Sequence, residues 1–168
     1  MRSKLVILVL MFCSLLNVVP VFAGLFDMPI EFKSIDLDVA SHYPMEDFLV
    51  IKNKADLDRV VKACQDTSAI GRDIELPKID FEKNMLIAVF GGRNTATSYS
   101  ICIEDVMLID DQIIVNVVKN GPERAIDHPN LTSPYHIIML PKTALGVKFL
   151  IQGAPSEFSV SDCMRTVD

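Results

Sequence analysis

Three histidines, His42, His128 and His136, are the residues of this sequence best suited to bind a metal or act as a general base. No two of them have the short spacing that places two imidazoles on one face of a strand or a helix. His128 follows Asp127 in a stretch that contains Pro and Asn, which is typical of a solvated turn. We therefore expect no metal site, and no cofactor.

Ser133 and His136 lie close together in the sequence. To act as a nucleophile and its base, they would also have to lie close together in space. Residues three apart on a strand point to opposite faces, so this strand cannot form the pair by itself. The chain also lacks a Gly-x-Ser-x-Gly nucleophile elbow. A Cys102–His136 dyad would require the tertiary structure to bring the two together. The sequence therefore predicts no catalytic residues and no enzymatic activity.

Residues 1–23 have the features of a cleavable secretory signal peptide: Arg2 and Lys4, then an apolar run over residues 5–16, then Pro20 and a small residue at Ala23. The apolar run is too short for a membrane-spanning helix, which needs about 20 residues. Phe12 before Cys13 disfavours a lipid-anchoring site, where a small residue is usual. We expect cleavage after Ala23, a periplasmic or secreted location, and no stable membrane insertion of the mature chain.

The charge of the chain limits its partners. It has 16 Lys and Arg against 22 Asp and Glu, and loss of Arg2 and Lys4 with the signal changes the formal charge from −6 to −8. Such an acidic chain is a poor match for nucleic acid or anionic lipid. The mature length suits one domain with a core of its own.

Three cysteines remain after cleavage: Cys64, Cys102 and Cys163. An odd number in an oxidising compartment indicates one disulfide and one thiol. A bridge from Cys64 to Cys163 would anchor the C-terminal tail to a helix, and a Cys102–Cys163 bridge is an equal alternative.

Apolar periodicity predicts one helix followed by several strands. A helix is expected to begin at Asn53, with Leu57, Val60 and Cys64 on its apolar face. Residues 85–90 are all apolar, as in a strand covered on both faces. Shorter strands are expected at residues 35–39, 48–51, 133–140 and 147–151.

Residues 98–109 and 112–119 form the clearest hairpin, with its turn at Asp110 and Asp111. The apolar phase of the first strand changes after Glu104 and Asp105, which predicts a one-residue bulge there. Together these elements predict an α+β fold, a mainly antiparallel curved β-sheet with one packed α-helix.

The second half of the chain resembles a known family. The segments that carry the resemblance are Ile79-Asp80-Phe81, the strand at residues 85–90, the Gly92-Arg93 segment that leads to Tyr99, and Thr132-Ser133-Pro134-Tyr135-His136. Over residues 48–151 the chain is similar to the C-terminal domain of the protease-complex subunit PrcB. That family usually has Thr-Gly-Gly-Tyr where this chain reads Ala96-Thr97-Ser98-Tyr99.

The resemblance implies an exported, non-catalytic subunit that associates with a secreted or surface protease. It divides the chain into a signal peptide (1–23), an N-terminal leader segment (24–47), the PrcB-like α+β domain (48–151) and a C-terminal tail (152–168). The alternative is a small secreted hydrolase or ligand-binding protein that uses a face carrying Tyr99 and His136.

We expect a protein partner to dock where two polar loops, residues 91–98 and 120–131, meet at one end of the sheet. Arg93 is suited to bind carboxylates and carbonyls there. The Gly91-Gly92 turn lacks the Gly-Lys-Ser/Thr ending of a phosphate-binding loop. The expected partner-binding residues are Arg93, Thr95, Tyr99, Thr132, Ser133, Tyr135 and His136.

Overall fold

The structure is a computed structural model that describes residues 27–39, 41–65, 74, 76–96, 99–121 and 129–153. The described part consists mainly of antiparallel strands with one helix, in agreement with the predicted α+β class. The expected signal peptide, most of the expected tail, and Cys163 lie outside the described residues. No helix in the described ranges is long and apolar enough to cross a membrane.

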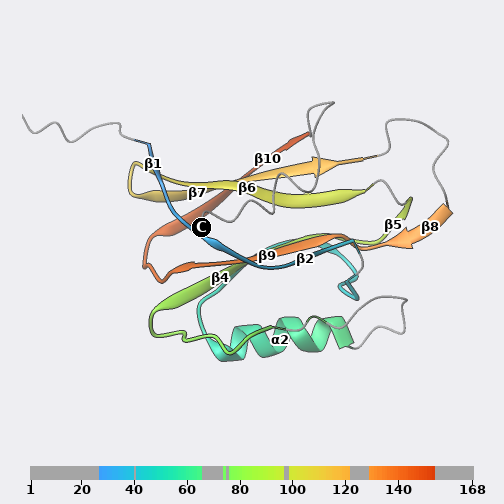
Figure 1. The fold of residues 1–168 in the computed structure, drawn as a ribbon, viewed down its shortest axis with the longest axis horizontal. Helices are drawn as coiled ribbons and strands as arrows, with labels where there is room; N and C mark the ends of the chain where they lie inside the picture. The colour runs from blue at the N-terminus through green and yellow to red at the C-terminus, as the bar shows by residue number, and fades with distance from the viewer. Residues whose placement is uncertain are drawn as a thin grey trace, which may run out of the picture.

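The strands form two four-stranded sheets and a short ribbon (Figure 1). Sheet A has the order β1 (Met28–Pro29), β6 (Ser100–Ile109), β7 (Gln112–Asn120) and β10 (Gly146–Gly153). Sheet B has the order β2 (Lys33–Asp38), β9 (Tyr135–Pro141), β4 (Asn84–Gly91) and β3 (Glu46–Ile51). The ribbon pairs β5 (Asn94–Ala96) with β8 (Pro129–Thr132). All pairs are antiparallel except β7 and β10.

The two sheets lie one above the other, so the expectation of a single curved sheet is wrong. Strand β4 explains why a second sheet is needed. Its residues Met85, Ile87 and Val89 face sheet A in one core cluster, and Leu86, Ala88 and Phe90 face the helix in another. Residues 85–90 are all completely buried, as predicted for a strand covered on both faces. One helix can cover only one of those faces.

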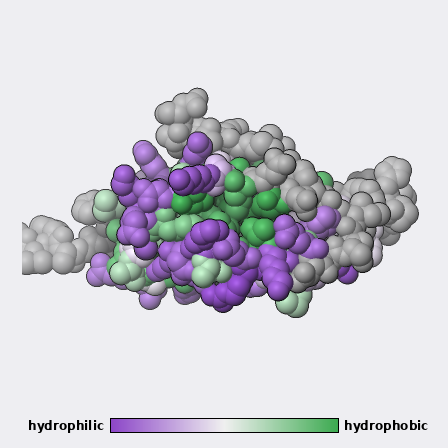
Figure 2. Space-filling view, turned by 90° about the horizontal axis from the view of Figure 1, so that it is seen from below, coloured by the Kyte–Doolittle hydropathy of each residue, from purple (hydrophilic) through white to green (hydrophobic). Residues whose placement is uncertain are grey.

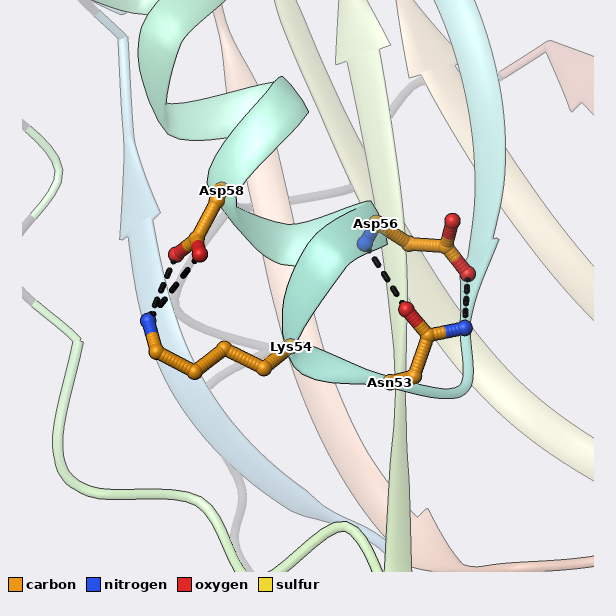
Figure 3. A network of polar contacts seen from close by, with 4 residues as sticks. All are labelled: Asn53, Lys54, Asp56 and Asp58. Atoms are coloured by element: carbon orange, nitrogen blue, oxygen red, sulfur yellow. Dashed lines mark hydrogen bonds and ion pairs between the residues drawn. The ribbon is translucent and has the colours of Figure 1, made fainter.

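Helix α2 (Lys54–Gln65) packs beneath sheet B in the view of Figure 1. Asn53 caps it as predicted: its side-chain oxygen accepts the amide hydrogen of Asp56 at 2.9 Å, and its amide donates to the Asp56 carboxylate at 2.7 Å (Figure 3). Lys54 pairs with Asp58 one turn along, at 2.7 Å. Val60 and Cys64 are the buried residues of the helix. Seen from below, hydrophilic side chains surround a smaller hydrophobic area (Figure 2).

The predicted hairpin is confirmed as β6 and β7. Asp110 and Asp111 both have positive φ, 48° and 58°, which suits the tight turn of a two-residue hairpin. The register shifts between Ile103 and Asp105, which places the predicted bulge at Glu104. Ile101, Ile103 and Val106 therefore all reach the core between the sheets.

In the segment expected to be a leader, residues 24–47, the described residues 27–39 and 41–47 contribute strands to both sheets. Within it β1 pairs with β6 in sheet A, and β2 pairs with β9 in sheet B. The predicted strand at residues 35–39 corresponds to β2. The sequence shows only weak alternation here because both strands lie at sheet edges, where their residues are half-buried or exposed.

Candidate functional site

The β5–β8 ribbon brings together the two loops that were expected to form a docking surface. Asn94 pairs with Thr132 and Ala96 with Pro129, so the two loops do lie side by side. Thr95 is exposed on this ribbon, and Arg93 is exposed in the turn directly before it. The ribbon lies at one end of the two sheets (Figure 1), so both side chains are presented there. We call this surface, Arg93 to Thr95 with the adjoining Tyr99, the ribbon end.

The turn before β5 is fixed by close packing. A Cβ atom on Gly91 would lie 2.9 Å from Cγ of Pro134, and one on Gly92 would lie 2.7 Å from the amide nitrogen of Glu46. Gly92 also has φ of 69°, which favours glycine. The amide of Asn94 donates to the carbonyl oxygens of Gly91 and Gly92, at 3.3 and 3.0 Å. These contacts hold the backbone on both sides of Arg93 in place relative to the sheets.

Two further features of this end could not be found from the sequence. Lys119 of β7 forms an ion pair with Glu46 of β3, which links the two sheets although the residues are 73 positions apart. Tyr99 is half-buried and lines a hollow of about 320 Å³ with Lys119, Gly121 and the last residues of β10. The Tyr99 ring lies against Gly121, where an added Cβ would be 3.4 Å from it. Tyr99 thus forms an aromatic side of this hollow, between Gly121 and the end of β10.

The other four expected partner-binding residues are buried, and this corrects their assignment. Thr132 and Ser133 are each 5% exposed, while Tyr135 and His136 are not exposed at all. A buried side chain cannot contact a docked protein unless the fold opens. Thr132 is the last residue of β8, and the other three lie in the segment that follows it into sheet B.

Ser133 joins β9 to the segment that precedes β3. Its hydroxyl donates to the carbonyl oxygen of Tyr43 at 2.8 Å and lies 3.0 Å from the hydroxyl of Ser41. Its amide and carbonyl groups bond to Val39 and Ser41 at 2.9 and 2.8 Å. With both backbone groups and the hydroxyl engaged, Ser133 is a structural residue.

Tyr135 is part of a row of aromatic rings beneath sheet B. Its ring centroid lies 6.1 Å from that of Phe90, which in turn stacks 4.1 Å from Tyr43. The Tyr135 hydroxyl donates to Asp36 at 2.7 Å, and the Tyr43 hydroxyl donates to Asp47 at 2.8 Å. Burial, followed by the Asp47 hydrogen bond, raises the pKa of Tyr43 to about 12. The Tyr43 phenol therefore stays a protonated donor at neutral pH.

His136 lies between the sheets with both ring nitrogens engaged. Nδ1 must accept, because its partner at 3.0 Å is the backbone N–H of Ile103. The proton of the neutral ring is then on Nε2, which donates to the Ser34 hydroxyl at 2.9 Å. Burial lowers the pKa of His136 to about 4. His136 is thus neutral and buried, and it is not exposed on the surface as the alternative prediction expected.

The cysteines distinguish between the two equal alternatives. Cys64 remains a thiol in the core beneath sheet B, and Cys102 of β6 is the disulfide-bonded cysteine. The predicted bridge at Cys64 is therefore wrong. Position 64 lies on the inward face of α2, packed among apolar neighbours rather than at the surface. The described ranges contain no cluster of three or more His, Cys, Asp or Glu that could hold a metal ion.

A second hollow, of about 310 Å³, lies between β3 and the first half of α2. Tyr43, Leu49, Ile51 and Val60 form its apolar wall, and the ion pair of Arg59 with Asp56 lies at its side. Its charged groups are paired with each other, and no convergent set of donors is aimed into it.

Comparison of the chain with protein-family models, with curated proteins and with solved structures finds no match in any of the three.

Proposed function

We propose that this chain is an exported, non-catalytic protein-interaction module that binds a protein partner at the ribbon end. The observation that carries this proposal is the β5–β8 pairing, which holds Thr95 exposed on a paired strand with the exposed Arg93 directly before it. Polar side chains on short, well-supported elements are typical of recognition surfaces. Arg93 can donate to carboxylates or to the carbonyl groups of a bound main chain.

The buried groups beneath the ribbon support the same proposal. Ser133, Tyr135 and His136 are engaged with groups of the fold itself, as are the two glycines of the turn. They reduce the freedom of the ribbon before a partner arrives, and a preorganised surface loses less conformational entropy on binding.

The resemblance to the PrcB C-terminal domain specifies the partner further: a secreted or surface protease, for which this chain is an accessory subunit or a modulator. We include this partner class in the proposal. The acidic mature chain is consistent with a protein partner rather than nucleic acid.

The test is capture from envelope and culture fractions of the source organism with the immobilised mature chain, followed by identification of the captured proteins and a peptidase assay of the eluate. We expect a protease among the captured proteins and a change in its activity when the chain is added. A mature chain that itself hydrolyses peptides or generic esters would contradict the proposal. Capture of proteins without any protease would contradict the partner class alone.

A further inference from the structure

The residues that lead into β3 lie beside the ribbon end. Glu46 pairs with Gly91 in the register of β3 and β4, and a Cβ atom on Gly92 would lie 3.0 Å from the carbonyl carbon of Met45. Met45 therefore adjoins Gly92, and Arg93 is the next residue along the chain. Neighbouring backbones of a sheet are about 5 Å apart, so Met45 and Arg93 belong to one surface.

Met45 contributes an apolar side chain to this surface. It is 64% exposed, the highest value among the exposed large apolar residues that the structure describes. A single exposed apolar residue is ordinary on a protein surface, and it is the position beside Arg93 that makes this one informative. Methionine is flexible and polarisable, so it adapts to apolar groups of different shape and is frequent at binding surfaces.

Arg93 carries a charge that its neighbours do not neutralise. Its side chain is exposed, and it forms no ion pair with any residue in the described ranges. Glu46, the acid next to Met45, pairs with Lys119 instead. The carboxylate of Asp47 accepts hydrogen bonds from the Tyr43 hydroxyl and from the amide of the following residue. Arg93 is therefore a local positive site in a chain whose net charge is negative.

The backbone at both positions is held by the fold. Asn94 donates to the carbonyl oxygens of Gly91 and Gly92, directly before Arg93. The Ser133 hydroxyl donates to the carbonyl oxygen of Tyr43 at 2.8 Å, two residues before Met45. A ligand that contacts Met45 and Arg93 therefore has to order little more than two side chains, which keeps the entropic cost of binding low.

We propose that the ribbon end binds an exposed segment of the partner in which an Asp or Glu lies within two residues of a large apolar side chain. Arg93 binds the carboxylate, and Met45 packs against the apolar group. A single arginine matches the charge of one carboxylate, whereas phosphorylated segments are usually bound by clusters of arginines. Residues one or two positions apart in an extended segment are separated by about 3 to 7 Å, which suits the neighbouring positions of Arg93 and Met45. The inference rests on the proposed function, because it assigns the chemistry that is recognised at the same surface.

An array of hexapeptides of random sequence, probed with the labelled mature chain, tests the proposal without knowledge of the partner. Peptides with an acid beside an apolar residue should bind at least about fivefold more strongly than matched peptides with lysine in place of the acid. Arg93→Glu should reverse this preference in favour of lysine, because it reverses the charge that the peptide meets. A variant that is merely destabilised would bind all peptides less well and would not reverse the preference.

Met45→Ser tests the apolar contact and should lower the binding of the acidic–apolar peptides at least about fivefold. Met28→Ser is the matched control. Met28 is 56% exposed, and its strand β1 lies at the opposite end of the molecule from the β5–β8 ribbon (Figure 1). This control should bind the peptides as the parent does, and thermal melts should show that both variants are folded.

Three results would overturn the inference: no preference for acidic peptides, a preference that Arg93→Glu leaves unchanged, or equal binding by Met45→Ser and Met28→Ser. Capture of a protease from envelope fractions, by a chain that shows no preference for acidic peptides, would leave the proposed function standing and overturn this inference alone.

Discussion

The imidazole of His136 accepts a hydrogen bond from the backbone amide of Ile103 at 3.0 Å, and this bond connects β9 of sheet B to β6 of sheet A. The amide belongs to β6 just before the Glu104 bulge, next to the register shift of the hairpin. The sequence suggests that His136 binds a partner at the surface. In the structure its ring accepts a hydrogen bond from a buried backbone amide, and leaving that amide without an acceptor would be costly.

The first prediction concerns this bond. His136→Ala removes the acceptor and leaves a cavity, so we expect the free energy of unfolding to fall by about 3 kcal/mol. His136→Asn offers a side-chain oxygen near the position of Nδ1 and should recover part of that loss. Urea unfolding of the three proteins measures the difference. Equal stability of the alanine variant and the parent would contradict the inferred role.

The pKa of His136 predicts a pH dependence of stability. The folded-state pKa is about 4, below the ordinary value of 6.5, so between these values the unfolded chain binds a proton that the folded chain does not. Stability contributed by neutral His136 is complete above pH 6.5 and is lost as the pH falls towards 4, by roughly 3 kcal/mol in total.

Other acids titrate in the same range, so His136→Asn is the reference for this measurement. The stability of the parent should fall more steeply than that of the variant between pH 6.5 and pH 4. Parallel curves of stability against pH for the two proteins would show that His136 has the same pKa in the folded and unfolded states, and would contradict the prediction.

The Ser133→Ala variant should show whether Ser133 stabilises the fold or contacts the partner. It removes the donor to the Tyr43 carbonyl and the contact with Ser41, and we expect a loss of about 1 to 3 kcal/mol in stability. At temperatures where the variant is folded, partner capture should equal that of the parent. A defect in partner capture without a loss of stability would contradict this prediction and would indicate that Ser133 contacts the partner.

For the disulfide we predict that Cys102 is joined to Cys163. Cys102 is disulfide-bonded and Cys64 is a thiol, and the cleavage that we propose after Ala23 would leave Cys163 as the remaining mature cysteine. The bridge closes a loop of about 60 residues, worth about 4 kcal/mol in the chain-entropy model. Peptide mapping without reduction should find this pair, and Cys64 should react with a thiol reagent only after unfolding. A Cys64-containing bridge would refute the assignment.

Local features of the fold could be predicted from the sequence because their causes are local. The Asn53 cap, the hairpin turn at Asp110 and Asp111, and the Glu104 bulge each depend on residues a few positions apart. The division into two sheets depends on the parallel pairing of β10 with β7, which no short pattern encodes.

The site was predicted only in part for the same reason. The polarity of loop 91–98 indicates Arg93 and Thr95 at the surface. His136 and Tyr135 were misjudged because the polar groups that satisfy them, on Ser34, Asp36 and Ile103, come from distant positions. One signal was available: Tyr135 and His136 precede an apolar run to Leu140, which is typical of a strand buried on both faces.

The ribbon end is tested most directly by capture with the Arg93→Ala/Thr95→Ala variant, beside the parent and Arg59→Ala. Arg59 is a matched control because it is an exposed arginine on α2, in a surface ion pair that contributes little to stability. From envelope fractions, the double variant should retain less than about a tenth of the captured partner, with a thermal midpoint within about 2 °C of the parent. Arg59→Ala should capture as the parent does. Undiminished capture by the double variant, or an equal loss with Arg59→Ala, would contradict recognition at the ribbon end.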